Sequence, residues 1–281
     1  MSIPSFALHS ASHALQSSLR GSMARQPHKP RLIVAGATGV LGNEVMHRLA
    51  GSGRYSQTEV VASAPMSTGT ASVGIALAGS NAIEDWPARP LTVHTAVVMF
   101  EPPRLYYGRE RSLWTPQPDQ LPALARWLMR CGVETLVIVL PHDTGRLPEA
   151  LKRGLANLDE LGVAALGFER LLLVRSARKP AAAMPGNVFE RTATFMLSTL
   201  ATMIPASEQP VRPAKLAQFI DAALRVLPPG THVASPELLH RANQTSSNPQ
   251  ASLDAPGMHA LVHSWLEAGQ NDRVHSEPPG P

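Results

Sequence analysis

Short, almost continuous apolar runs recur along the middle of the chain and predict buried β-strands. The runs are RLIVA (31–35), TEVVAS (58–63), SVGIAL (72–77), TAVVMF (95–100), ETLVIVL (134–140) and FERLLLVRS (168–176), with THVAS (231–235) as a shorter last candidate. Strands that are apolar along their whole length are typical of parallel sheets, which are covered on both faces.

Between these runs, apolar residues recur at helical spacing. The predicted helices cover 40–50, 119–131, 148–162, 187–204 and 213–227, with shorter pieces near 82–88, 236–242 and 258–268. Gly162 stands where a helix-ending glycine is expected. Alternating strands and helices predict an α/β fold, a Rossmann-like doubly wound parallel sheet with a small C-terminal helical region on its substrate side.

The two ends of the chain differ in composition from its middle. Residues 1–30 contain no acidic residue and only three Lys or Arg, and we interpret them as a disordered leader, with a targeting signal as the alternative. Residues 243–281 are rich in Ser, Asn, Gln and Pro and are expected to form a mostly disordered tail. The folded domain is therefore predicted to span 31–242.

Composition excludes several classes of partner. The net charge of +4 is carried by no basic block, so nucleic acid is not expected, and no apolar run is long enough to span a membrane. Cys131 is the only cysteine, which excludes an internal disulfide; we expect a buried thiol in a cytoplasmic protein. The 11 histidines are scattered without ligand spacing, so no metal is predicted.

The most informative stretch is AGATGVLG (35–42), which follows a predicted strand and opens a predicted helix. The first glycine permits a tight turn, the second lets a pyrophosphate approach the backbone, and the third lets the helix pack close to the strand. Free amides and the helix dipole then face the anion. We expect dinucleotide binding here, with a turn kept only for packing as the alternative; the residues are Gly36, Ala37, Thr38, Gly39, Val40, Leu41 and Gly42.

The end of the second strand bears on the choice of cofactor. An acidic residue there favours NAD, and a basic residue favours NADP. The sequence VVASAPMSTG (60–69) has neither, and Ser63 is expected to contact a phosphate. Because nothing there would repel a 2′-phosphate, NADP is preferred over NAD.

Beyond the glycine turn, three segments carry a family resemblance: LPALARWLMRCGVETLVIVL (121–140), LGFERLLLVRSAR (166–178) and PVRPAKLAQFIDAAL (210–224). With them, residues 31–242 resemble the atypical short-chain dehydrogenase/reductase family, in its NAD(P)H-binding, Tat-interacting oxidoreductase-like branch. The resemblance implies a Rossmann domain that binds NAD(P), with C-terminal helices on the substrate side.

The resemblance also implies a Ser or Thr after the fifth strand and a Tyr-x-x-x-Lys pair on the next helix. Here the strand ends in Leu140 and Pro141, and the helix begins PEALK. Lys152 falls at the lysine position, but Pro148 falls at the tyrosine position, so the usual acid is missing. Lys152 is either a remaining ribose ligand or an ordinary surface lysine.

Two groups of residues are candidate substitutes. His142, with Asp143 and Thr144, follows the fifth strand at the edge where ligands bind, and is either an acid or part of a polar turn. The loop after the fourth strand is either a site for an anionic substrate or partner or a solvated loop; its candidate residues are Arg104, Tyr106, Tyr107, Arg109 and Arg111.

Three functions remain open at this point. The chain is an active reductase with a rearranged acid, a cofactor-sensing module that binds a protein partner, or a protein whose turn has lost its ligand. We favour an NAD(P)-binding, oxidoreductase-like protein that is weakly active or non-catalytic. The pattern leaves the small-molecule or protein partner and the oligomeric state undetermined.

Overall fold

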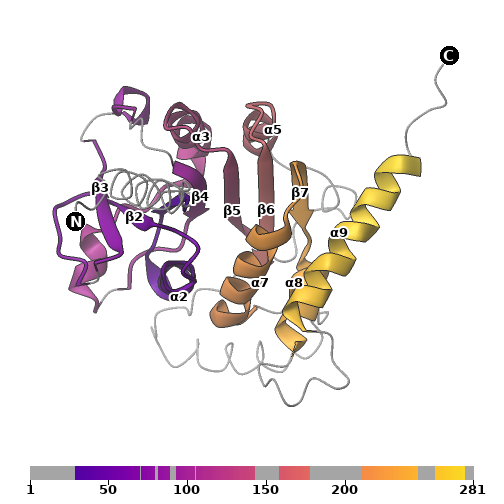
Figure 1. Cartoon of the computed structure of the whole chain (residues 1–281). Coiled ribbons are helices and arrows are strands. Elements are labelled where there is room, and N and C mark those ends of the chain that lie inside the picture. Colours follow the sequence, from indigo (N-terminus) through magenta and orange to yellow (C-terminus); the bar gives the residue numbers. More distant parts are fainter. Residues whose placement is uncertain are drawn as a thin grey trace, which may run out of the picture.

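The computed structural model describes residues 29–69, 71–79, 82–88, 93–104, 106–142, 158–177, 211–245 and 257–275. Within them, one seven-stranded sheet has the order β3-β2-β1-β4-β5-β6-β7 (Figure 1). The strands are β1 (Arg31–Ala35), β2 (Gln57–Ala62), β3 (Val73–Leu77), β4 (Val93–Met99), β5 (Thr135–His142), β6 (Arg170–Ala177) and β7 (Gly230–Ala234).

Every pair of neighbouring strands in this sheet is parallel. The chain starts in the middle of the sheet at β1, moves outward to β3, and then returns to place β4 on the other side of β1. The direction of winding therefore reverses between β1 and β4, as in a dinucleotide-binding α/β sheet. The predicted α/β class with a doubly wound, Rossmann-like sheet is confirmed.

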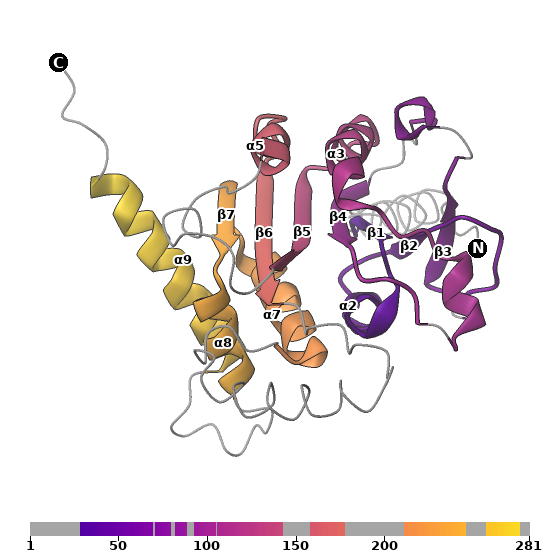
Figure 2. The same cartoon turned by 180° about the vertical axis from the view of Figure 1, so that it is seen from behind.

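The helices lie in two layers on either side of the sheet. In Figures 1 and 2, α3 and α5 lie together on one side, whereas α2, α7 and α8 lie on the other, and α9 lies beside α7 at the β7 end. Their bounds are α2 (Gly39–Gly51), α3 (Leu121–Arg130), α5 (Leu158–Ala164), α7 (Pro213–Val226), α8 (Pro236–Gln244) and α9 (Met258–His275). Short 3-10 turns occur at Ile83–Asp85, Gly108–Ser112 and Pro118–Gln120.

Alternate residues of each central strand enter two separate cores. Leu32 and Val34 of β1 pack with Phe219 of α7, whereas Ile33 packs with Leu124 of α3 on the opposite face. All five side chains are 2% exposed or less. Burial on both faces explains why the strands are apolar throughout.

Some predicted bounds differ from the structure. The predicted helix stop at Gly162 is wrong, because α5 continues to Ala164 and so places Val163 in the core. The predicted helix at 187–204 lies outside the described residues. The short helix predicted at 258–268 forms as α9, runs on to His275, and packs Val262 into the core.

Two further observations concern the described residues alone. Cys131 at the end of α3 is a buried thiol, as expected. In this part of the chain, no helix combines the length and the apolar character needed to cross a membrane, and no three His, Cys, Asp or Glu side chains gather as a metal site would require.

Candidate functional site

The glycine turn connects the carboxyl end of β1, a central strand, to the start of α2. Gly36 has φ = 75° and Gly39 has φ = 71°, a left-handed conformation that other residues adopt at a cost. A Cβ on Gly42 would lie 2.5 Å from the carbonyl oxygen of Gly36, so only glycine lets α2 start this close to β1. The turn therefore depends sterically on all three glycines.

Helix α2 has no capping group of its own. Its N-cap residue, Thr38, makes no side-chain capping bond, and its first turn contains no acidic residue. The first amides of a helix lack partners within it and need acceptors from elsewhere. Two carboxylates supply them: Gly39 N donates to Glu110 Oε2 at 3.0 Å, and Leu41 N donates to Glu101 Oε2 at 2.7 Å.

Glu110 is buried, with 7% of its surface exposed, and makes several charge-assisted contacts. Besides the Gly39 amide, it accepts from Arg104 N at 2.9 Å and from Arg104 Nε at 2.7 Å, and it forms an ion pair with Arg104 Nη2. Burial disfavours its charge, but the hydrogen bonds from Arg104 and Gly39 outweigh burial and hold the pKa of Glu110 below its usual 4.5. Glu110 therefore remains an anion at neutral pH.

Both acids belong to the segment between β4 and α3, which crosses the carboxyl edge of the sheet. The segment leaves β4 at Phe100. It contacts the glycine turn at Glu101, whose carbonyl accepts a hydrogen bond from Thr38 Oγ1. It then reaches the end of β2, where Leu113 forms an antiparallel bridge with Ala62. Gly36 N in the glycine turn also donates to the carbonyl of Trp114 in this segment, at 3.2 Å. The segment thus covers the crevice where the winding reverses.

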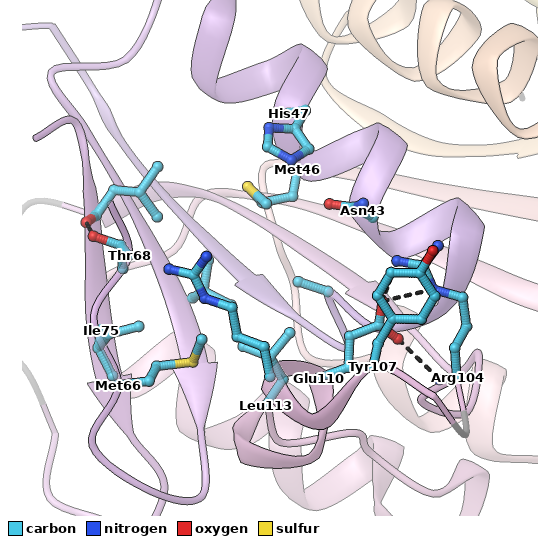
Figure 3. A pocket seen from close by; sticks show the side chains of 14 residues that line it. Asn43, Met46, His47, Met66, Thr68, Ile75, Arg104, Tyr107, Glu110 and Leu113 are labelled. Carbon is cyan, nitrogen blue, oxygen red and sulfur yellow. Dashed lines mark hydrogen bonds and ion pairs between the residues drawn. The ribbon is translucent and has the colours of Figure 1, made fainter. Parts of the chain in front are cut away.

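A pocket of about 270 Å³ lies beside the turn, between α2 and the end of β2 (Figure 3). Right-handed crossover places α2 on this face, but the described residues between β2 and β3 form no helix to cover the rest of it. Apolar side chains line much of the pocket, namely those of Ala37, Met46, Val60, Met66, Val73, Ile75 and Leu113. Polar and charged side chains complete it: Asn43, His47, Thr68, Arg104, Tyr107, Arg109 and Glu110.

The structure brings some of the predicted anion-binding residues to this pocket. Arg104 stacks on the Tyr107 ring with its guanidinium 3.8 Å from the centroid, and Figure 3 shows both beside Glu110. Arg109 lines the pocket and bonds the Ser67 carbonyl of the β2–β3 connection. Tyr106 is 96% exposed, and Arg111 is also exposed; neither lines the pocket.

Of the predicted cofactor residues outside the glycine turn, the structure describes only Ser63. The Ser63 hydroxyl donates to the Ser112 carbonyl at 3.2 Å. His142 is the last residue of β5, at the carboxyl edge, but its side chain lies outside the described residues. Lys152 lies outside them altogether, as do Asp143, Thr144 and Pro148.

The three tyrosines of the chain all fall within the described residues. Tyr55 precedes β2, at the amino edge of the sheet, and burial raises the pKa of its hydroxyl. Tyr106 and Tyr107 belong to the β4–α3 segment. None follows β5, where the family resemblance implies the tyrosine acid.

Glu101 and Glu110 are the residues of this site that the sequence analysis missed. Two acids in a loop directly after β4 were the available signal, because the ends of β1 and β4 are neighbours once the strands are placed. The local pattern alone carries no such information, since these acids are 60 and 71 residues away from the amides they bind.

Strand order, parallel pairing and the glycine turn define a doubly wound α/β protein of the Rossmann-like class. No protein-family model and no curated protein matches the sequence. Solved structures with a similar course include uronate dehydrogenase from Agrobacterium tumefaciens, at 15% identity and a TM-score of 0.42 over 90% of this chain and 91% of that one.

Two other solved structures match as loosely. UDP-N-acetylglucosamine 4-epimerase from Bacillus cereus is 11% identical, with a TM-score of 0.40 over 85% of this chain and 99% of that one. The Bordetella bronchiseptica enzyme WbmH in complex with NAD⁺ is 12% identical, with a TM-score of 0.39 over 90% and 84%. The fold class rests on the strand order of this chain and not on these matches.

Proposed function

We propose that this chain binds a nicotinamide dinucleotide at the carboxyl edge of its sheet and transfers hydride weakly or not at all. One observation carries the proposal: the amides of Gly39 and Leu41 each donate to a carboxylate oxygen. An N-terminal helical turn that holds two anionic oxygens has the donors that a diphosphate needs. The turn also lies at the switch point, where ligands bind in sheets of this kind.

NADP is the proposed dinucleotide, and the pocket supports this choice. It lies between the turn and the end of β2, on the side where the adenosine half of a dinucleotide is expected. Arg109 supplies a cation on its wall, and the sequence from Val60 to Gly69 contains no acid to repel a 2′-phosphate. An arginine near this position is the usual partner of that phosphate.

The sequence after β5 supports the proposal that hydride transfer is weak or absent. A carbonyl reductase needs a proton donor within hydrogen-bond reach of the substrate oxygen. The resemblance implies a tyrosine for this role, and Pro148 stands in its place. His142 at the end of β5 is the remaining candidate acid, and we assign it no more than residual activity.

Fluorescence titration of the purified chain with NADPH and NADH tests cofactor binding. Val40, at the start of α2, is 45% exposed, so Val40→Glu adds a charge without disturbing the core. In the cofactor-free chain the helix dipole offsets the repulsion of that charge by Glu101 and Glu110, whereas a bound dinucleotide adds the negative charge of its diphosphate beside them. We expect Val40→Glu to weaken NADPH binding roughly three- to tenfold with unchanged thermal stability.

Val40→Gln is the matched neutral control and should bind as the wild type does. Equal affinity of the Glu and Gln variants would place the diphosphate elsewhere. A folded chain that binds neither dinucleotide, even when Glu101 or Glu110 is replaced by Gln, would leave the turn as a packing device and end the proposal.

Hydride transfer is tested separately with a panel of aldehydes, ketones and quinones. We expect turnover far below the roughly 1–10³ s⁻¹ of typical enzymes. Any residual turnover should disappear in His142→Ala if that residue is the acid, with NADPH affinity retained. Turnover in the ordinary range would reject a non-catalytic role, and residual turnover that survives His142→Ala would remove His142 as the acid.

A further inference from the structure

The described parts of the segment from Glu101 to Gln117 (101–104 and 106–117), here called the strap, occupy the site that the proposed function requires. A Cβ on Gly39 would lie 2.2 Å from Glu101 Cδ. The Glu101 carboxyl group thus fills the space that the missing Cβ leaves open. In a dinucleotide site, that space lets the pyrophosphate approach the backbone.

Glu110 occupies a second position on the same turn. It accepts from Gly39 N and also holds the guanidinium of Arg104, so a cation beside the turn is paired with an internal acid. Two carboxylates on one helix N-terminus present about the same charge as a diphosphate. Each amide has only one hydrogen to donate, so the carboxylates and a diphosphate compete for the same donors.

The strap is attached to the sheet unevenly. Its later part is fixed by backbone hydrogen bonds, from Trp114 N to the Val61 carbonyl at 3.0 Å and from Gly36 N to the Trp114 carbonyl at 3.2 Å. Its earlier part contacts the turn and not the strands: Thr38 Oγ1 donates to the Glu101 carbonyl, and the carboxylates of Glu101 and Glu110 accept from the amides of α2. Moving Glu101 and Glu110 off the turn therefore breaks contacts with the turn but none of the strand pairs of the sheet.

We infer that the strap is a built-in competitor of the dinucleotide: Glu101 and Glu110 hold the turn amides in the cofactor-free chain, and the diphosphate replaces them. On displacement, Arg104 loses Glu110 as its partner and is free to pair with the diphosphate. This regulation rests on the proposed function. It makes cofactor affinity the difference between two sets of charge-assisted bonds, because occupying the site requires releasing the strap.

Glu110→Gln and Glu101→Gln test the inference, with NADPH titration and amide hydrogen exchange as readouts. A neutral amide oxygen is a weaker acceptor than a carboxylate, so each variant removes part of the competition. We expect NADPH to bind about tenfold more tightly to Glu110→Gln and several-fold more tightly to Glu101→Gln. Without cofactor, exchange should accelerate at Gly39 in the first variant and at Leu41 in the second.

Glu44→Gln is the control, because it removes one negative charge from an exposed position on the same helix. It should change neither readout. A purely structural strap predicts the opposite sign, since losing a cap destabilises the turn and weakens binding.

Folded Glu110→Gln and Glu101→Gln variants that bind NADPH no more tightly than the wild type would overturn the strap and leave the proposed function standing. Absence of binding by wild type and both variants would overturn both. Glu101 is only half-buried, so its variant serves as the test if Glu110→Gln does not fold.

Discussion

At the residue scale, two single side chains from outside the glycine turn provide the acceptors for its amides. The backbone of Gly36 and Gly39 creates the turn, but the carboxylates of Glu101 and Glu110 satisfy its amides. The same amides suit a diphosphate, because a helix N-terminus favours any anion of suitable size. The ligand preference of the turn is therefore set by neighbours that the turn itself does not contain.

Arg109 is the residue on which the choice between NADP and NAD is predicted to depend. It lines the pocket beside the end of β2, and a charge-assisted bond to the 2′-phosphate requires its guanidinium. Arg109→Gln should weaken NADPH binding about tenfold and leave NADH binding unchanged, as measured by parallel fluorescence titrations.

The control for Arg109 is Arg126→Gln, which removes an equal charge from a surface ion pair of α3 with Glu84. It should alter neither affinity. If Arg109→Gln weakened both dinucleotides equally, the arginine would act on the diphosphate or on the pocket wall and not on the 2′-phosphate.

At the element scale, the packing of α7 against α2 joins a late helix of the described chain to its first helix. Asp221 of α7 is buried and faces three arginines, at 3.5 Å from Arg48 Nε, 3.8 Å from Arg54 Nη1 and 3.2 Å from Arg225 Nη2. Lys215, in the first turn of the same helix, donates to the Thr245 carbonyl at the end of α8. These contacts fix the helical layer on which the glycine turn is built.

Asp221→Asn should therefore destabilise the whole domain. Removing one partner of a buried ion pair costs several kcal/mol, but the arginines here are partly exposed, so we expect about 1–2 kcal/mol in the free energy of unfolding. Chemical denaturation measures this change.

Glu84→Gln is the matched control, because it breaks an ion pair whose two side chains are 56% and 58% exposed. It should cost less than about 0.5 kcal/mol. Equal effects of the two variants would show that Asp221 does not link α7 to α2.

At the scale of the whole molecule, the strands of the sheet could be predicted from local sequence, whereas the contacts between distant segments could not. The sequence predicted the described strands to within a few residues, because a strand buried on both faces is an uninterrupted apolar run. It predicted the glycine turn for a similar reason, because the positive φ of Gly36 and Gly39 and the close approach of Gly42 to the Gly36 carbonyl are local requirements for glycine. The predicted end of α5 at Gly162 was wrong, since the helix continues to Ala164 and Val163 is buried in the core.

The sequence by itself determined the class of the fold and the position of the turn, since hydrophobic periodicity and backbone sterics act over a few neighbouring residues. Only the tertiary structure decided that Glu101 and Glu110 cap α2, because those contacts join parts of the chain 60 and 71 residues apart. The sequence of a loop shows which of its residues are polar, but it does not show which distant residues the loop contacts. The sheet brings the ends of β4 and β1 together, and that adjacency places two internal anions on the turn where a diphosphate is expected.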